Sequence, residues 1–350
     1  MTLSGSFALF PLPCCNLDPT VITQGPDGAL WYSLADNAIG RITTSGDETQ
    51  YPISSQPYLG IATGPDGALW FAECDSNLIG RLTTAGGLTE YLVPTPKSCP
   101  GGITAGPDGA LWFTEGTGNN IGRITTAGAI TNEYPLGRFR NPLSITAGPD
   151  GALWFTEGNG IAGRITTSGA FTQYNTRATL FGAGGNITSG PDGALWFTAP
   201  TSNEVGRVTT DGAITMYEMP ASDSQPTGIA SGPDGDIWFT EFYNNNQGHA
   251  QGDKIGRIPA CGLGLTASFT AGTLTVKAEP GINRPAIWTL SAGAGYGFTK
   301  RVAGIVPPRP FTFTYRNYPN VGKLRITSKL SDNAGRLLCS EYTTVNTASK

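Results

Sequence analysis

The stretch GPDGALWFTE fills residues 106–115 and returns unchanged at residues 148–157. Its core pattern, G-P-D-G-[AD]-[LI]-W, occurs six times, at intervals of 39, 42, 42, 42 and 42 residues. A constant period near about forty residues indicates one supersecondary unit copied in tandem. The six copies start at Gly25, Gly64, Gly106, Gly148, Gly190 and Gly232.

One unit, residues 102–136, reads GITAGPDGALWFTEGTGNNIGRITTAGAITNEYPL. Proline fixes φ and glycine accepts a positive φ, so PDG predicts a tight turn. The runs GIT, ALWFTE, NIGRITT and AITNEYPL then predict four short antiparallel strands, with no helical period. One such sheet cannot bury both apolar faces, whereas copies packed radially can. The chain is therefore predicted to be all-β, with a six-bladed β-propeller over residues 1–260.

The repeated tryptophans are expected between adjacent blades, and each repeated arginine is expected to pair with a turn aspartate. The sixth unit ends at KIGRIPAC without an outer strand, whereas SGSFALFPLP, residues 4–13, resembles an outer strand. We expect this segment to join the sixth sheet and close the ring, since an open sheet edge invites aggregation.

The C-terminal part, residues 261–350, contains six or seven strand-like runs and predicts a small immunoglobulin-like β-sandwich. It holds 11 Lys and Arg against 3 Asp and Glu, whereas residues 1–260 hold 11 against 23. The acidic body argues against nucleic-acid binding. The basic part is expected to meet an anionic surface polymer or a protein partner, or to dock on the propeller. No apolar run approaches the ~20 residues of a membrane helix.

The cysteines contain no CxxC pair, which argues against a structural zinc site. Their even number and the Thr-, Ser- and Gly-rich composition favour an oxidising compartment with one to three disulfides, and hence an extracellular or cell-surface protein. Reduced, buried cysteines are the alternative. Cys14, Cys15, Cys74 and Cys99 are expected in loops of one face, braced by disulfides whose pairing the sequence leaves open, and Cys261 is a candidate partner of Cys339 by position alone. The six cysteines are Cys14, Cys15, Cys74, Cys99, Cys261 and Cys339.

The GPDG and TTAG turns hardly vary, whereas the loops expected on the opposite face of the ring differ in length and composition, as binding loops do. Carboxylates there predict a site for Mg²⁺ or Ca²⁺, with water-exposed strand ends as the alternative. His249, the single histidine of the chain, is a candidate general base, with a solvated loop side chain as the alternative. The predicted ligand-facing rim consists of Glu73, Glu115, Glu157, Glu241, Tyr243 and His249, with Glu241 as the metal candidate. The chain has no P-loop, GxSxG, HExxH or EF-hand pattern.

The unit quoted above resembles the blade of the streptogramin lyase (virginiamycin B lyase) family over about 250 residues. The resemblance implies a seven-bladed propeller, closed by an N-terminal strand, that opens a cyclic depsipeptide by Mg²⁺-assisted elimination. It also implies a Glu-Pro-His-Gly-Ile segment that supplies the base, and glutamates that hold the metal. The matching segment here is QPTGI, residues 225–229, so Gln225 replaces the glutamate and Thr227 replaces the histidine, while Glu241 is kept.

Three functions follow from these observations. The first is a non-catalytic extracellular binding protein whose variable face takes a small molecule, a peptide or a glycan, with the basic domain as an anchor. The second is a divergent Mg²⁺-dependent lyase that recruits His249 and Glu241. The third is a structural or assembly subunit.

Overall fold

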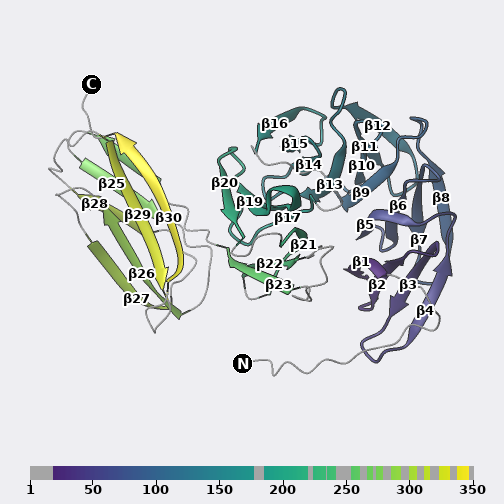
Figure 1. Ribbon diagram of the computed structural model, residues 1–350, viewed down its shortest axis with the longest axis horizontal. Helices are drawn as coiled ribbons and strands as arrows, with labels where there is room; N and C mark the ends of the chain where they lie inside the picture. The colour runs from purple at the N-terminus through teal and green to yellow at the C-terminus, as the bar shows by residue number, and fades with distance from the viewer. Residues whose placement is uncertain are drawn as a thin grey trace, which may run out of the picture.

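The computed structural model describes residues 19–176, 185–219, 224–233, 235–241 and 254–260, followed by seven strands between residues 266 and 346. These residues confirm the all-β class, because the helical content among them is a single 3₁₀ turn, η1 (Pro200–Ser202). Six sheets are arranged around a centre, each with its first strand innermost (Figure 1). The propeller therefore has the six blades that the repeat predicts.

Five blades are four-stranded antiparallel sheets in chain order. The first consists of β1 (Pro19–Gln24), β2 (Leu30–Leu34), β3 (Ala38–Ile42) and β4 (Glu48–Pro52). The second consists of β5 (Pro57–Thr63), β6 (Leu69–Glu73), β7 (Leu78–Leu82) and β8 (Leu88–Leu92). The third consists of β9 (Pro100–Ala105), β10 (Leu111–Glu115), β11 (Asn120–Ile124) and β12 (Ile130–Pro135). The fourth consists of β13 (Pro142–Ala147), β14 (Leu153–Glu157), β15 (Ile161–Ile165) and β16 (Phe171–Asn175). The fifth consists of β17 (Ile187–Ser189), β18 (Leu195–Ala199), β19 (Glu204–Val208) and β20 (Ile214–Glu218). The sixth consists of β21 (Pro226–Ser231), β22 (Asp236–Glu241) and β23 (Lys254–Pro259).

The invariant turn works as its residues predict. In the third blade the N–H of Gly106 donates to the carbonyl of Ala110, and the N–H of Gly109 donates to the carbonyl of Gly106. Gly109 has a φ of 74°, a left-handed conformation that glycine adopts without steric cost. The turn therefore joins the inner strand β9 to β10 in a fixed register.

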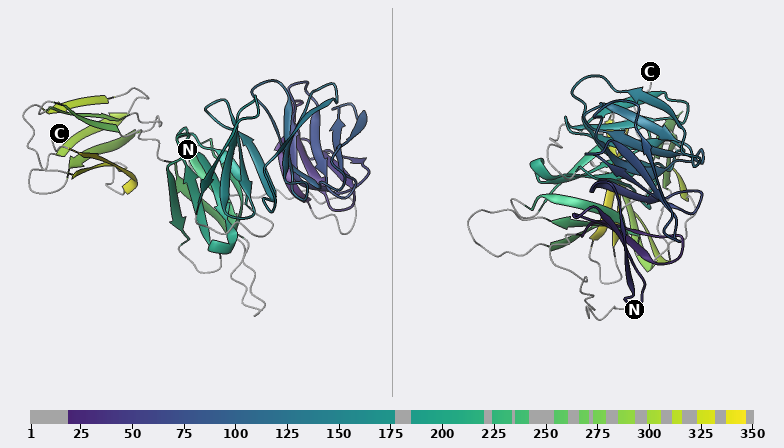
Figure 2. Two further views of the ribbon diagram at one scale, coloured as in Figure 1. Left: turned by 90° about the horizontal axis from the view of Figure 1, so that it is seen from above. Right: turned by 90° about the vertical axis from the view of Figure 1, so that its right-hand side faces the viewer.

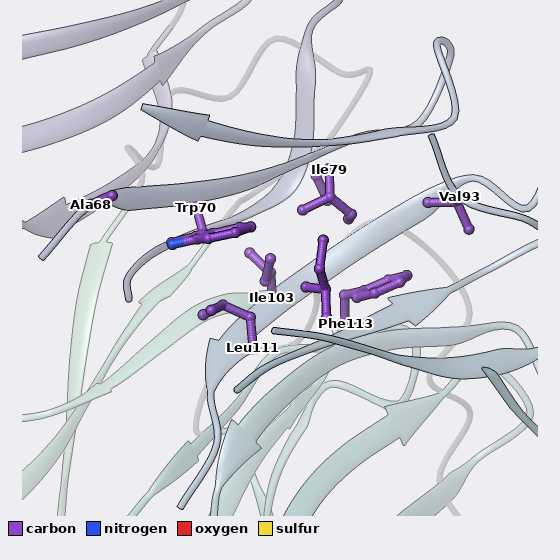
Figure 3. Close-up of a cluster of buried hydrophobic side chains, with 9 residues drawn as sticks. Ala68, Trp70, Ile79, Val93, Ile103, Leu111 and Phe113 are labelled. Carbon is purple, nitrogen blue, oxygen red and sulfur yellow. The ribbon is translucent and has the colours of Figure 1, made fainter. Parts of the chain in front are cut away.

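Tryptophans fill the spaces between blades, as expected. Trp70 of the second blade lies over Leu111 and Phe113 of the third in one buried cluster (Figure 3). Each of five tryptophans also stacks on a tyrosine from the outer strand of its own sheet, with ring centroids 5.4–5.8 Å apart. The pairs are Trp31–Tyr51, Trp70–Tyr91, Trp112–Tyr134, Trp154–Tyr174 and Trp196–Tyr217.

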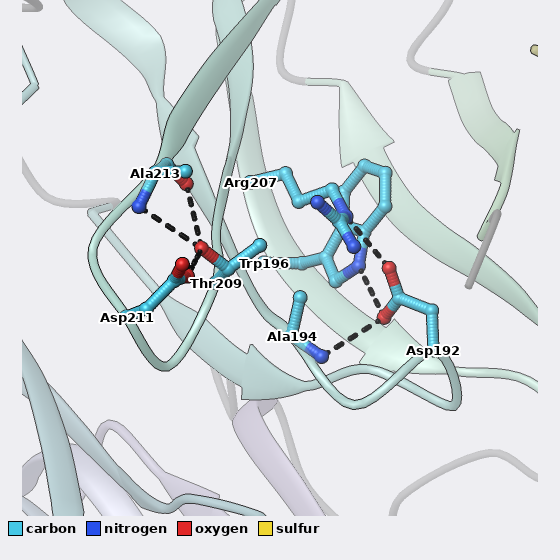
Figure 4. A network of polar contacts seen from close by, with 7 residues as sticks. All are labelled: Asp192, Ala194, Trp196, Arg207, Thr209, Asp211 and Ala213. Atoms are coloured by element: carbon cyan, nitrogen blue, oxygen red, sulfur yellow. Dashed lines mark hydrogen bonds and ion pairs between the residues drawn. The ribbon is translucent and has the colours of Figure 1, made fainter. Parts of the chain in front are cut away.

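The turn aspartate joins this tryptophan to the repeated arginine. In the fifth blade, Trp196 Nε1 donates to Asp192 Oδ1 at 3.0 Å and Arg207 Nε donates to Asp192 Oδ2 at 2.7 Å (Figure 4). The first five blades share this arrangement, which confirms the predicted structural pairing there. In the sixth blade Arg257 Nε lies 3.1 Å from Asp236 Oδ2, and Asp234 lies outside the described residues.

The first and sixth blades form the two ends of the array. Ile22 of β1 is 62% exposed, whereas the equivalent residue of the third blade, Ile103 of β9, is 6% exposed. Ile255 of β23 is 71% exposed, whereas the equivalent residue of the second blade, Ile79 of β7, is 0% exposed. The closing strand predicted at residues 4–13 lies outside the described residues.

The C-terminal strands form two antiparallel sheets, which Figures 1 and 2 show as two layers. One sheet is ordered β24 (Thr266–Thr270), β25 (Thr273–Ala278), β28 (Phe311–Tyr315). The other is ordered β27 (Thr299–Ile305), β26 (Pro285–Ala292), β29 (Lys323–Ser331), β30 (Leu337–Asn346). The immunoglobulin-like sandwich stays a prediction. In the part of the chain that the structure describes, no helix is long and apolar enough to cross a membrane.

Candidate ligand-binding face

Two kinds of loop meet on one face of the propeller, as predicted. The loop between β6 and β7 is joined to the connection between β8 and β9 by a disulfide, Cys74–Cys99. In the next blade, Asn119 Oδ1 accepts the N–H groups of Arg140 and Asn141 at 2.7 and 3.1 Å. These contacts hold variable loops of the second and third blades together on this face. Cys14, Cys15 and Cys261 lie outside the described residues.

Glu73 and Glu115, two members of the predicted rim, are fully buried. Glu73 Oε2 accepts the backbone N–H of Ser55 at 2.7 Å, and Glu115 Oε2 accepts Asn120 Nδ2 at 3.1 Å. Burial raises the pKa of both carboxyls from 4.5 to about 7. The negative charges of Glu90 beside Glu73 and Glu133 beside Glu115 contribute to this rise, and the hydrogen bonds from Ser55 and Asn120 oppose it. These two side chains are held by the protein beneath the connections between blades.

Glu157, a third member, is also fully buried. Its Oε1 accepts Gln173 Nε2 at 2.7 Å, and its Oε2 lies 3.6 Å from Arg140 Nη1. Burial raises the pKa of this carboxyl, and Gln173 and Arg140 lower it in part. Arg140 belongs to the connection between the third and fourth blades, so Glu157 anchors that connection as Glu73 anchors the one before β5. The sequence repeat alone did not predict that Glu157 and Glu73 anchor the connections between blades.

Glu241 ends β22, is half-buried, and pairs with Pro226 across the sheet. Tyr243 and His249 lie outside the described residues, so their predicted places on the rim stay predictions.

A hollow of about 740 Å³ is lined by the inner strands of the first, second, fifth and sixth blades together with β22 and β23 of the sixth blade. Ile22, Leu59, Ile229, Trp238 and Ile255 provide most of its apolar wall. Threonine, asparagine and glutamine side chains complete the wall, and none of the described residues that line it carries a charge. A concave, mainly apolar surface with a few hydrogen-bonding groups is typical of a small-ligand site.

Thr227, at the position of the histidine that the resemblance implies, lies in this wall. Its hydroxyl is 2.8 Å from the hydroxyl of Thr240, which also accepts the N–H of Gly228 at 2.9 Å. Its carbonyl accepts the hydroxyl of Thr198 at 2.7 Å and Asn186 Nδ2 at 3.1 Å. A threonine hydroxyl does not take up a proton near neutral pH as an imidazole does. The wall at this point is a network of neutral groups.

The residues present here also fit a Mg²⁺ ion poorly. Among the described residues, no three His, Cys, Asp or Glu side chains come together in a group able to hold a metal. Among the described residues at this strand end, the carboxylate of Glu241 lies opposite Pro226, whose neighbour Gln225 carries an amide, whereas Mg²⁺ prefers charged oxygen ligands. The predicted metal role of Glu241 stays a prediction.

Comparison with known proteins shows where this propeller has relatives. Residues 1–179 and 131–263 match the model of the Virginiamycin B lyase family. A virginiamycin B lyase from Saccharopolyspora erythraea is 44% identical over 82 residues, which are 23% of this chain and 27% of that enzyme. The aligned stretch thus spans about a quarter of that relative's length, while the family match as a whole ends at residue 263.

Solved structures give a longer match. A streptogramin B lyase structure has a TM-score of 0.63 and 34% identity, over 76% of this chain and 92% of that chain. Virginiamycin B lyase from Staphylococcus aureus has a TM-score of 0.62 and 36% identity, over 75% of this chain and 92% of that chain. A catalytically inactive histidine-to-alanine variant of the S. aureus enzyme, solved with quinupristin, has a TM-score of 0.63 and 36% identity, over 77% of this chain and 94% of that chain.

Proposed function

Since this chain belongs to the virginiamycin B lyase family, we propose that it uses the family's propeller as a binding scaffold and does not catalyse the elimination reaction. The observation that carries the proposal is Thr227, whose hydroxyl is 2.8 Å from that of Thr240 in an uncharged wall. A lyase needs a proton acceptor at this point, and the described wall offers hydroxyl and amide groups.

The ligand that this hollow suits is a compact molecule with apolar side groups, such as a cyclic peptide. Its apolar wall provides burial, and the hydroxyls of Thr20 and Thr227 provide a few directional contacts. Quinupristin is the appropriate probe, because a structural relative has been solved with it. A glycan ligand would favour more polar contacts than this wall provides.

Calorimetric titration of quinupristin tests the proposal. We expect Thr20→Asp, which puts a charge into the hollow, to weaken binding by at least about tenfold. Thr20 is exposed on β1, so the fold should tolerate the change. Leu92→Asp is the matched control, because Leu92 is 69% exposed on the outer strand β8, outside the residues that line the hollow. Equal affinities in both variants, or no binding by the unchanged chain, would refute the binding role.

The second candidate is a divergent lyase, which family membership and the retained Glu241 favour. In that case quinupristin is opened in the presence of Mg²⁺, and His249→Ala abolishes the opening. The linear elimination product is an isomer of the cyclic compound, so the assay must separate the two by chromatography and identify them by fragmentation.

We further propose that the protein works outside the cell and that its basic C-terminal part is the anchor. The disulfide Cys74–Cys99 supports an oxidising compartment. The excess of 11 basic over 3 acidic residues in 261–350 supports contact with an anionic polymer. Retention of the full chain on heparin should fall steeply with salt. Elution without retention at low salt would contradict the anchor. A defined oligomer or filament in solution would instead favour the structural-subunit alternative.

A further inference from the structure

Phe139 is the most exposed large apolar side chain among the described residues, at 86%. It lies in the connection between β12 and β13, and its φ of 62° is left-handed. A bulky side chain rarely adopts this conformation, because its Cβ approaches the following carbonyl oxygen. The exposed ring gains no packing in return, and strain of this kind gathers at functional positions.

The path of the connection sets this backbone conformation. Lys97, in the connection between β8 and β9, is also left-handed, with a φ of 54°. Both residues stand three positions before the proline that begins the next inner strand, Pro100 for Lys97 and Pro142 for Phe139. Both side chains are exposed. The connections of these blades therefore present one side chain to solvent at the same place.

The tip that carries Phe139 is held on both sides. The carbonyl of Asn119 accepts the N–H of Leu136 at 2.9 Å, and Asn119 Oδ1 accepts the N–H groups of Arg140 and Asn141 at 2.7 and 3.1 Å. Arg140 Nη1 also lies 3.6 Å from Oε2 of the buried Glu157. A partner that contacts the ring therefore meets a preorganised loop, which lowers the entropic cost of binding.

The loop between β10 and β11, residues 116–119, joins this tip to the connection that carries Lys97. The N–H groups of Thr117 and Gly118 both donate to the carbonyl of Ser98, at 3.0 Å. Asn119, in the same loop, holds the tip on the other side. Lys97 and Phe139 therefore belong to one continuous surface built from three loops.

Positive charge is concentrated on this surface. Of the 11 Lys and Arg in residues 1–260, six are blade arginines that pair with aspartates. Three of the remaining five are Lys97, Arg138 and Arg140. Arg140 is turned to Glu157, whereas Lys97 and Arg138 are exposed.

Negative charge is missing from the same loops. Residues 94–99, 116–119 and 137–141 contain no Asp or Glu, although residues 1–260 as a whole hold 23 of them. An acidic propeller thus carries a local cationic surface with an aromatic ring at its tip, which indicates an anionic partner.

We propose that Lys97, Arg138 and Phe139 form a basic–aromatic patch that contacts an anionic lipid surface. The ring of Phe139 enters the headgroup region, and the guanidinium of Arg138 binds a lipid phosphate. The proposal is independent of the binding function proposed above, since none of these three residues lines the hollow.

The chemistry of the patch suits a lipid surface. Apolar side chains next to Lys and Arg are typical of segments that lie in the membrane interface, and a guanidinium binds a phosphate through two parallel hydrogen bonds. A stable protein interface draws on about 20–30 residues of each partner, whereas the patch offers three. A lipid surface accepts a protruding ring without a complementary pocket.

Sedimentation of the full chain with vesicles tests the proposal. We expect binding to vesicles of equal parts phosphatidylcholine and phosphatidylglycerol, none to phosphatidylcholine alone, and release at high salt, because salt screens the charges. The double variant Arg138→Ser, Phe139→Ser should bind at least about tenfold more weakly. Both changed positions are exposed, so the fold should tolerate the changes.

Leu92→Ser with Lys254→Ser is the matched control, because it also removes one exposed apolar and one exposed basic side chain, outside the patch. It should bind like the unchanged chain. Equal affinities of the patch variant and the control would overturn the proposal and assign any lipid binding to another part of the chain. Failure of the unchanged chain to bind the anionic vesicles would overturn it as well.

Hydrogen exchange of the unchanged chain locates the contact without any substitution. We expect the amides of residues 137–139 to exchange at least about tenfold more slowly when anionic vesicles are added. Unchanged exchange there while the chain is bound would contradict the assignment. Polyglutamate is the last probe: if it protects these amides and the vesicles do not, the patch takes an acidic polypeptide, and the lipid proposal is wrong.

Discussion

Ser55 donates both its backbone N–H and its hydroxyl to one oxygen of Glu73, at 2.7 and 3.3 Å. The neighbouring Ser54 donates the same two groups to Glu90, at 3.0 and 2.7 Å. Two carboxyl groups of the second blade thus hold the connection that leads into it. Within the part of the chain that the structure describes, Glu73 Oε1 is buried and has no hydrogen-bond partner. Ionising Glu73 beside the charge of Glu90 is therefore costly.

This arrangement predicts that stability falls as the pH rises from about 4.5 to about 7. Burial raises the pKa of Glu73 in the folded protein to about 7, whereas its ordinary value is 4.5. Between these values the folded state retains a proton that the unfolded state has released, so folding is favoured below the window and loses this contribution across it. Urea unfolding at pH 5 and pH 8 measures the loss.

Glu73→Gln should reduce this pH dependence, because glutamine keeps the shape and cannot ionise. Asp36→Asn is the control, since Asp36 is exposed on a loop of the same face. A wild-type midpoint that rises between pH 5 and pH 8, with the Gln variant unchanged from it, would contradict the explanation.

Removing the disulfide should destabilise the rim without changing the ring. Cys74 and Cys99 are 25 residues apart in sequence, and closing a loop of that length contributes about 3–4 kcal/mol to the free energy of unfolding. Cys74→Ser with Cys99→Ser should therefore lower the denaturation midpoint, and adding a reductant should lower the wild type to the same value. A reductant that further destabilises the double variant would point to a second disulfide.

The turn aspartate predicts a second stability effect. Asp108→Ala removes the acceptor of both Trp112 Nε1, at 3.1 Å, and Arg123 Nε, at 2.8 Å. Trp112 is fully buried, so its indole N–H would lose its partner, at a cost of about 1–3 kcal/mol in the free energy of unfolding. Asp75→Ala, at an exposed loop position, should cost far less. Thermal unfolding of the two variants compares them, and similar losses would show that the bridge has no structural role.

The repeat predicted the blades because each local signal occurs in every unit. The residues that form the turn at Gly106, the following tryptophan and the aspartate–arginine pair lie less than about 20 positions apart in each unit. The repeat in the sequence therefore predicts all three features. Membership of the lyase family was readable for the same reason, whereas the replacement of its histidine by Thr227 stays what the resemblance implies.

The surroundings of the predicted rim carboxylates were not readable in this way. Glu73 and Glu115 end strands next to variable loops, which suggested exposure, yet both are fully buried under connections between blades. Burial depends on how Ser55 and its neighbours fold back over the strand end, and such long-range contacts leave no periodic signal. The serine pair at residues 54 and 55, next to the start of β5, was the available hint.

The central claim is that the propeller of a lyase is retained here without its chemistry. The most direct measurement is the ring opening of quinupristin with Mg²⁺, in the unchanged chain and in a Gln225→Glu, Thr227→His variant that restores the two residues implied by the family resemblance. We predict that the unchanged chain leaves quinupristin cyclic and that the variant yields its linear isomer. Opening by the unchanged chain at a rate equal to that of the variant would contradict the account.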